Sequence, residues 1–310
     1  MFTYILKRLL QTIPVLLGVS LVTYLLIFAV AANPARLAMG VRGDQATVDS
    51  IRQELGLNDS LLVQYGHFLW KAVHGDFGRS FSTGDEVLPA MLERFPATLN
   101  LGMIALLVSI AIGIPLGLLS AVYQNRWPDH TLRVLALLGI SVPSFFLGIL
   151  LAWVFGYILG WTPLSGYAPG LEGVPYYTLP VLALALGPMA VFSRLVRSSV
   201  LEVINADYVI AARARGVYPF KLMTKHVLKN ALIPVITTIG SALAALLSGA
   251  FFVEYIFNWP GIGLLAVDSI SNYDIPMVQG TVMFSAFLFV VANILVDIAY
   301  TWVDPRVRLK

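Results

Sequence analysis

Cysteine is absent from this sequence, and charged residues are scarce. The absence of cysteine excludes disulfide bonds, thiolate metal sites and cysteine nucleophiles. Charged residues make up 12% of the 310 residues, whereas soluble domains carry roughly 25%. Hydrophobic residues make up 58%, and the mean hydropathy is +0.81. A soluble core cannot absorb so much apolar surface, so the composition indicates a polytopic membrane protein.

Long apolar runs are the main feature that is present. A helix needs about 20 such residues to cross a bilayer. We expect six spans: Leu9–Ala31, Ala97–Val122, Val134–Trp161, Tyr177–Val196, Leu232–Val253 and Val278–Trp302. Pro180 and the Gly187-Pro188 pair interrupt the fourth run, and neighbouring helices can accommodate such a break. The first run is too long for a signal-peptide core, so it is interpreted as a retained anchor.

The basic residues predict the orientation of these spans. With the N-terminus in the cytoplasm, most of the 20 Lys and Arg residues lie in cytoplasmic segments. The short outer loops at about 162–176 and 254–277 contain none. We therefore expect an N-terminal segment with the first helix (1–32), an extracytoplasmic segment (33–96), a five-helix core (97–302) and a cytoplasmic tail (303–310).

The extracytoplasmic segment contains a helical pattern of its own. Apolar residues recur at helical spacing at Leu61, Leu62, Tyr65, Phe68, Leu69 and Val73. Gly75 ends this pattern, which predicts an amphipathic helix over 60–74 on the outer mouth, with Gln64 on its polar face. The Asp76-Phe77-Gly78 string that follows is interpreted as a turn, because no nucleotide-binding loop accompanies it.

Metal and nucleotide sites are not indicated. The four histidines, His67, His74, His130 and His226, are divided between the two sides of the predicted membrane, so they form no transmembrane cage. No G-x-x-x-x-G-K-[ST] pattern is present to hold nucleotide phosphates. We therefore expect no metal, no cofactor and no catalytic residue on this chain.

A basic island, RARGVYPFKLMTKHVLKN, lies at Arg213–Asn230 in the largest inner loop, 197–231. Gly216 suits the left-handed conformation that ends a helix, and Pro219 suits the first turn of a second helix. The charges alone also fit a topology signal, but a topology signal needs no second helix. The pattern therefore predicts two short helices around a glycine turn. The candidate caps of the first helix are Glu202, Asn205 and Asp207.

The island resembles the EAA loop of ABC-importer permeases, on Ala211–Gly216 followed by His226–Asn230. Ile210 stands where the name-giving Glu would be, and Lys229 where a proline is usual. The whole chain resembles the first permease subunit of the dipeptide, oligopeptide, glutathione and nickel importers. The supporting strings are Tyr4–Leu10, Asn33–Arg36, Leu55–Asn58, Gly75–Gly78, Asn125–Asp129, Val253–Gly263 and Asp304–Arg306.

This resemblance implies a type I ABC-importer-like permease in a bacterial or archaeal cytoplasmic (inner) membrane. It also implies a second permease subunit, two ATPase subunits that bind ATP and Mg²⁺, and an extracytoplasmic substrate-binding protein, but no nucleic acid. In that family the loop docks into an ATPase subunit. The residues that the resemblance assigns to docking are Ala211, Ala212, Arg213, Arg215, Gly216, Pro219, Lys221, His226 and Asn230.

A second candidate site lies at the outer end of the fifth span. Trp259, Pro260 and Gly261 would belong to a gate or outer mouth, and Glu254 would either line that gate or cap a loop. Short peptides are the favoured substrate, followed by glutathione and then nickel.

A gradient-driven carrier is the alternative of a different class. Such a carrier is expected to need several ionisable groups inside the membrane. The sequence offers Asp297, for which a structural hydrogen bond with Asn293 or Tyr300 is the favoured interpretation.

Overall fold

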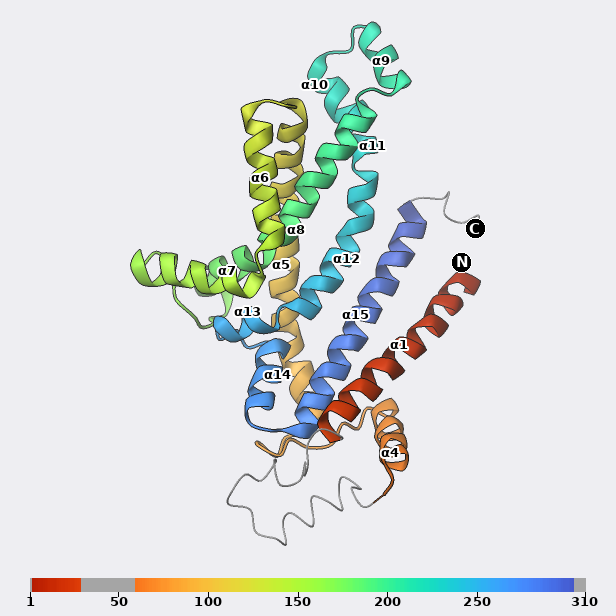
Figure 1. The fold of residues 1–310 in the computed structure, drawn as a ribbon, viewed down its shortest axis with the longest axis vertical. Helices are drawn as coiled ribbons and strands as arrows, with labels where there is room; N and C mark the ends of the chain where they lie inside the picture. Colours follow the sequence, from red (N-terminus) through yellow and green to blue (C-terminus); the bar gives the residue numbers. More distant parts are fainter. Residues whose placement is uncertain (1, 29–58, 304–310) are drawn as a thin grey trace. The chain divides into compact units, whose positions relative to one another are not determined.

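The computed structural model describes residues 2–28 and 59–303, whose regular elements are helices (Figure 1). The strings Asn33–Arg36, Leu55–Asn58 and Asp304–Arg306 lie outside the described residues. Two compact units are present. The first comprises Met1–Thr98 and Pro260–Ile294, and the second comprises Leu99–Trp259 and Leu295–Lys310.

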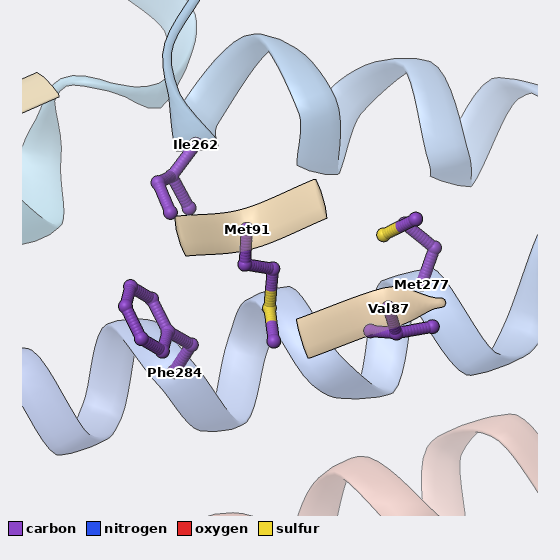
Figure 2. Packing of buried hydrophobic residues seen from close by; sticks show 5 residues of the cluster. All are labelled: Val87, Met91, Ile262, Met277 and Phe284. Carbon is purple, nitrogen blue, oxygen red and sulfur yellow. The ribbon is translucent and has the colours of Figure 1, made fainter. Parts of the chain in front are cut away.

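The first unit contains α1 (Phe2–Phe28), α4 (Leu61–Val73), the start of α5 (Val87–Val122), α14 (Ile262–Ser271) and most of α15 (Ile275–Val303). Its buried core joins three of these helices. Figure 2 shows Val87 and Met91 of α5, Ile262 of α14, and Met277 and Phe284 of α15 packed together. Helix α5 begins at Val87 rather than at the predicted Ala97, so part of the predicted outer segment continues directly into a span.

Polar contacts hold α4 against α1 in this unit. The Tyr24 hydroxyl donates to Gln64 Oε1 at 2.9 Å, and the Ser20 and Tyr65 hydroxyls lie 2.7 Å apart. Gln64 is therefore buried, and the prediction that it lies on an exposed polar face is wrong. The exposed side chains of α4 include Trp70, at 71% exposure. Helical spacing alone could not show that a glutamine on α4 has a tyrosine partner on another helix.

The second unit is built around three helices, α5, α6 (Trp127–Ser141) and α8 (Val174–Val203). Glycines allow their close approach. A Cβ atom on Gly113 would lie 2.7 Å from the Met189 backbone oxygen, and one on Gly117 would overlap the Ser193 backbone oxygen. The Ser109 hydroxyl also donates to the Ala185 backbone oxygen at 2.9 Å.

Further helices complete the second unit. After α6 come α7 (Ser144–Leu151), the π-helix η2 (Ala152–Ile158) and the 3₁₀ turn η3 (Gly170–Gly173). After α8 come α9 (Asp207–Ala214), α10 (Pro219–Lys221), the π-helix η4 (Leu222–Leu228), α11 (Lys229–Ala231), α12 (Ile233–Gly249) and α13 (Phe251–Ile256). Asp297 lies in α15, but its side chain is outside the described part of the structure.

The helices account for the predicted spans with one correction. Among the described residues, three helices are long and apolar enough to cross a membrane, or up to five if each bent pair is one span. Helix α1, apolar over Leu10–Leu26, matches the remaining predicted run. The third run, Val134–Trp161, is not one straight helix, because the chain bends by 104° between α6 and α7. Pro143 at this bend lacks the N–H needed to continue a helix. Helix α8, by contrast, runs continuously through Pro180 and Pro188.

Candidate functional site

The loop that contains the basic island forms two short helical segments joined by a turn, at one end of the second unit (Figure 1). Helix α9 starts after Ala206, and no side chain caps its N-terminus, so the predicted capping is wrong. Asn205 instead donates to the Leu201 backbone oxygen. The second segment runs from Pro219 through Lys229 to Ala231, and the chain then bends by 51° into α12. Helix α8 ends at Val203, so the first residues of the predicted loop 197–231 belong to that helix.

Gly216 makes the turn between the two segments. Its φ is +77°, in the left-handed region that favours glycine, as the sequence predicts. Its N–H donates to the Arg213 backbone oxygen at 3.0 Å, and the Val217 N–H donates to the Ala212 backbone oxygen at 3.3 Å. A Cβ atom on Gly216 would meet nothing within 4 Å, so a substitution there would be opposed by backbone strain and not by crowding.

One tyrosine joins the two segments by its side chain. Asn230 Nδ2 donates to the Tyr208 hydroxyl at 2.7 Å, and that hydroxyl donates to the His226 backbone oxygen at 3.4 Å. The side chains of Val209 and Val227, each next in sequence to one of these residues, are fully buried. Sequence reasoning selected Asn230 and His226 but missed Tyr208, because its partners lie far along the chain. Tyr208 follows Asp207 in the first turn of α9, and nothing in the local sequence indicates that its hydroxyl forms a bond to the second segment.

The outer surface of the loop combines cations with exposed apolar side chains. Arg213, Arg215 and Lys221 are exposed, as are Ala211 and Pro219, whereas Ala212 is buried. Three large apolar side chains are exposed beside them: Ile210 (52%), Tyr218 (73%) and Phe220 (72%). Exposed aromatic and arginine side chains are typical of a protein–protein contact.

A buried carboxylate secures the helices that carry the loop. Asp129 of α6 is fully buried, and its two oxygens accept from Arg197 Nε at 2.7 Å and Nη2 at 2.8 Å. It also accepts from the Ser120 hydroxyl of α5 at 2.6 Å and from the Asn125 backbone N–H at 2.8 Å. This cluster joins α5, α6 and α8 close to the start of the loop. By sequence alone, Arg197 is one of the basic residues near the cytoplasmic side, and nothing along the chain marks Asp129 as its partner.

The residues of the predicted outer gate do not lie on an open surface. Glu254 of α13 and Trp259 are both fully buried in the second unit. The Trp259 ring packs edge-on against Tyr167 and Tyr177, with ring centroids 5.0 Å and 4.4 Å away. Gly261 precedes the first residue of α14, and Pro260 is half-buried. A gating role for these four residues stays a prediction.

Comparison with known protein families identifies the class of protein. The model described as "Binding-protein-dependent transport system inner membrane component" matches residues 113–309. A model for the N-terminal part of such membrane components matches residues 1–102. The chain belongs to this family and is a multi-pass permease subunit of an ABC importer, in which ATP hydrolysis belongs to other components.

Individual relatives cover the chain from end to end. It is 42% identical to a protein of Brucella abortus (strain 2308) named as a peptide transport system permease, over 99% of both chains. It is 38% identical to the glutathione transport system permease protein GsiC of Escherichia coli (strain K12), over 100% of both chains.

Two solved structures share the fold. The inward-facing MetNI methionine ABC transporter matches with a TM-score of 0.53 and 20% identity, over 69% of this chain and 94% of that chain. An amino acid ABC transporter matches with a TM-score of 0.54 and 16% identity, over 70% of this chain and 94% of that one.

Proposed function

We propose that this permease forms half of a translocation pore for short peptides and receives the energy of ATP hydrolysis through the loop 204–231. Two separate ATPase subunits would bind ATP and Mg²⁺, and a second permease subunit would form the other half of the pore. An extracytoplasmic binding protein would deliver the substrate. No cofactor is assigned to this chain.

The observation that carries the coupling role is the construction of the loop. Two helical segments are held at a defined angle by a left-handed glycine and by the Tyr208–Asn230 bond. The surface that they present contains exposed aromatic and arginine side chains next to each other. A topology signal needs only the charges, whereas a rigid contact that transmits force needs the fixed angle as well.

The test is Gly216→Val in the complex reconstituted into lipid vesicles. A branched residue held in the left-handed conformation costs on the order of 1–2 kcal/mol, and relief of that strain would reorient the second segment. We expect the variant to insert and to bind its partner permease, but to lose most substrate-stimulated ATP hydrolysis and uptake.

Gly170→Val is the matched control for this substitution. Gly170 has φ +66° and, like Gly216, a Cβ position with nothing within 4 Å. It lies in η3, away from the loop, so the backbone cost is similar while coupling should be retained. Full transport by Gly216→Val, or uptake without any ATPase subunit, would instead support a gradient-driven carrier.

Short peptides are proposed as the substrate because the relatives at 42% and 38% identity are named for peptide and glutathione transport, and glutathione is itself a tripeptide. Nickel is the weakest candidate. Competition between labelled dipeptides, glutathione and Ni²⁺ for uptake into cells that express the complete complex would rank the three. Saturable uptake of Ni²⁺ that dipeptides do not inhibit would contradict the proposal.

The outer helix α4 is proposed to contact the binding protein. A photo-crosslinking amino acid at the exposed position of Trp70 should capture that protein, whereas the same group at the buried position of Gln64 should not. Crosslinks from Trp70 to this chain alone would show that α4 has an internal role instead.

A further inference from the structure

A groove of about 700 Å³ runs between α6 and α8, close to the end of these helices that carries the loop. Helix α6 contributes Arg133, Leu137 and Ile140, which recur at helical spacing along one face. Helix α8 contributes Arg194 and Val191, one turn apart, among other residues. The groove is a feature of the helix surface, separate from the exposed face of the loop.

The groove changes character along its length. The helices are antiparallel, since Asp129 pairs with Arg197 at one end and Gly139 approaches Ala190 further along. Arg133 therefore lies at the loop end, and Ile140 lies about 10 Å deeper along the helix axis. Leu137 and Ile140 are exposed in this chain, at 54% and 42%. With the loop on the cytoplasmic side, the cationic end would lie toward the membrane interface and the apolar end toward the membrane interior.

The cationic end has more positive than negative charge. Three arginines line it. Among the described residues, the carboxylate that pairs with them is Asp129, which is already bound by both Nε and Nη2 of Arg197. Arg133 Nε is 3.6 Å from the same carboxylate, and its Nη2 donates to His130 Nδ1. Arg194 is exposed and makes no hydrogen bond or ion pair within the part of the chain that the structure describes. An anion would partly offset the charge of the two remaining guanidinium groups.

We propose that this groove binds an anionic phospholipid, with the headgroup phosphate on Arg133 and Arg194 and an acyl chain along Leu137, Ile140 and Val191. Guanidinium groups bind phosphate oxygens in a bidentate geometry. Basic pockets between membrane helices on the cytoplasmic side favour anionic headgroups. The apolar floor distinguishes a lipid from a free phosphate, because a soluble anion leaves that floor uncovered.

A lipid in this position would contact α6 and α8 simultaneously, next to the Asp129 cluster that joins them. It would therefore stabilise the pair of helices from which the loop extends. This inference depends on the membrane environment of the chain and not on the proposed coupling or substrate.

The test measures phosphatidylglycerol retained by the purified native complex after exchange into phosphatidylcholine nanodiscs, with native mass spectrometry as the readout. We expect specific retention of phosphatidylglycerol by the unmodified protein. Arg194→Gln should weaken it about fivefold, the usual contribution of one basic residue near an anionic membrane surface. Arg126→Gln is the matched control, because Arg126 is exposed at the same end of α6 but does not line the groove.

A second variant tests the apolar floor. Ile140→Trp fills the groove without a change of charge and should also reduce phosphatidylglycerol retention. Equal retention by Arg194→Gln and the unmodified protein would overturn the proposal. Complete displacement of the lipid by millimolar glycerol phosphate would show a site for free anions, and crosslinking of Arg194→Cys to the partner permease would show a subunit interface. Either result also overturns the proposal.

Discussion

The loop and the helices that carry it are built in opposite ways. Helices α5, α6 and α8 meet through glycines and a fully buried carboxylate. At the glycines of α5, the backbone of one helix lies close to backbone and side-chain atoms of the other. The loop 204–231 exposes most of its polar residues and is held by a glycine turn and one tyrosine hydroxyl. The first arrangement resists deformation, whereas the second presents a surface whose angle depends on a few bonds.

This difference separates two kinds of variant. A change among the three helices should destabilise the protein, because close-packed backbone cannot move away from an added atom. A change in the loop should leave the membrane helices folded and should affect the partner contact only. Stability and transport, measured on the same variants, therefore distinguish the two regions.

The largest loss of stability is expected for Asp129→Ala. The change leaves the partly buried Arg197 without its carboxylate and the Asn125 N–H without its acceptor. Removal of one partner from a buried ion pair costs about 3–5 kcal/mol. Thermal unfolding of the detergent-solubilised protein would measure the loss.

Glu86→Gln is the control for this ion pair. Glu86 pairs with Arg79 at 3.2 Å, but the two side chains are 62% and 68% exposed. Exposed pairs contribute less than about 1 kcal/mol. If the two variants lowered the unfolding temperature equally, the Asp129 cluster would not be the structural joint described here.

An intermediate effect is expected for Gly117→Ala. Its Cβ would overlap the Ser193 backbone oxygen of α8, which cannot move as a side-chain end can. Overpacking of this kind costs about 1–3 kcal/mol. Gly18→Ala in α1 meets nothing within 4 Å and should be neutral or slightly stabilising. An unchanged unfolding temperature for Gly117→Ala would mean that α5 and α8 are less closely packed.

The smallest effect on stability is expected for Tyr208→Phe. Loss of this hydroxyl removes the bond from Asn230 and the one to His226, at a cost of about 1 kcal/mol. We expect a near-normal unfolding temperature together with a several-fold drop in substrate-stimulated ATP hydrolysis. Tyr218→Phe is the control, since Tyr218 is 73% exposed. Normal coupling in Tyr208→Phe would show that the angle between the two segments is set by the Gly216 turn alone.

Local patterns predicted much of the loop and much of the helical fold. Gly216 could be assigned a positive φ because glycine adopts such a conformation far more readily than other residue types. Pro219 could be placed in the first turn of a helix because no backbone N–H is needed there. The 104° bend after α6 could not be predicted from the apolar run Val134–Trp161, because Pro143 marks a point where a helix can break but does not set the angle.

The sequence by itself determined the membrane class, the helical runs and the position of the loop, because apolar length, charge distribution and glycine or proline geometry are properties of short segments. The tertiary structure decided which side chains meet. Gln64 faces Tyr24, Tyr208 bonds to Asn230, and Asp129 binds Arg197 across 68 residues of chain. A periodic pattern shows that a residue faces a neighbour, but only the packed helices show which neighbour has the complementary group at bonding distance.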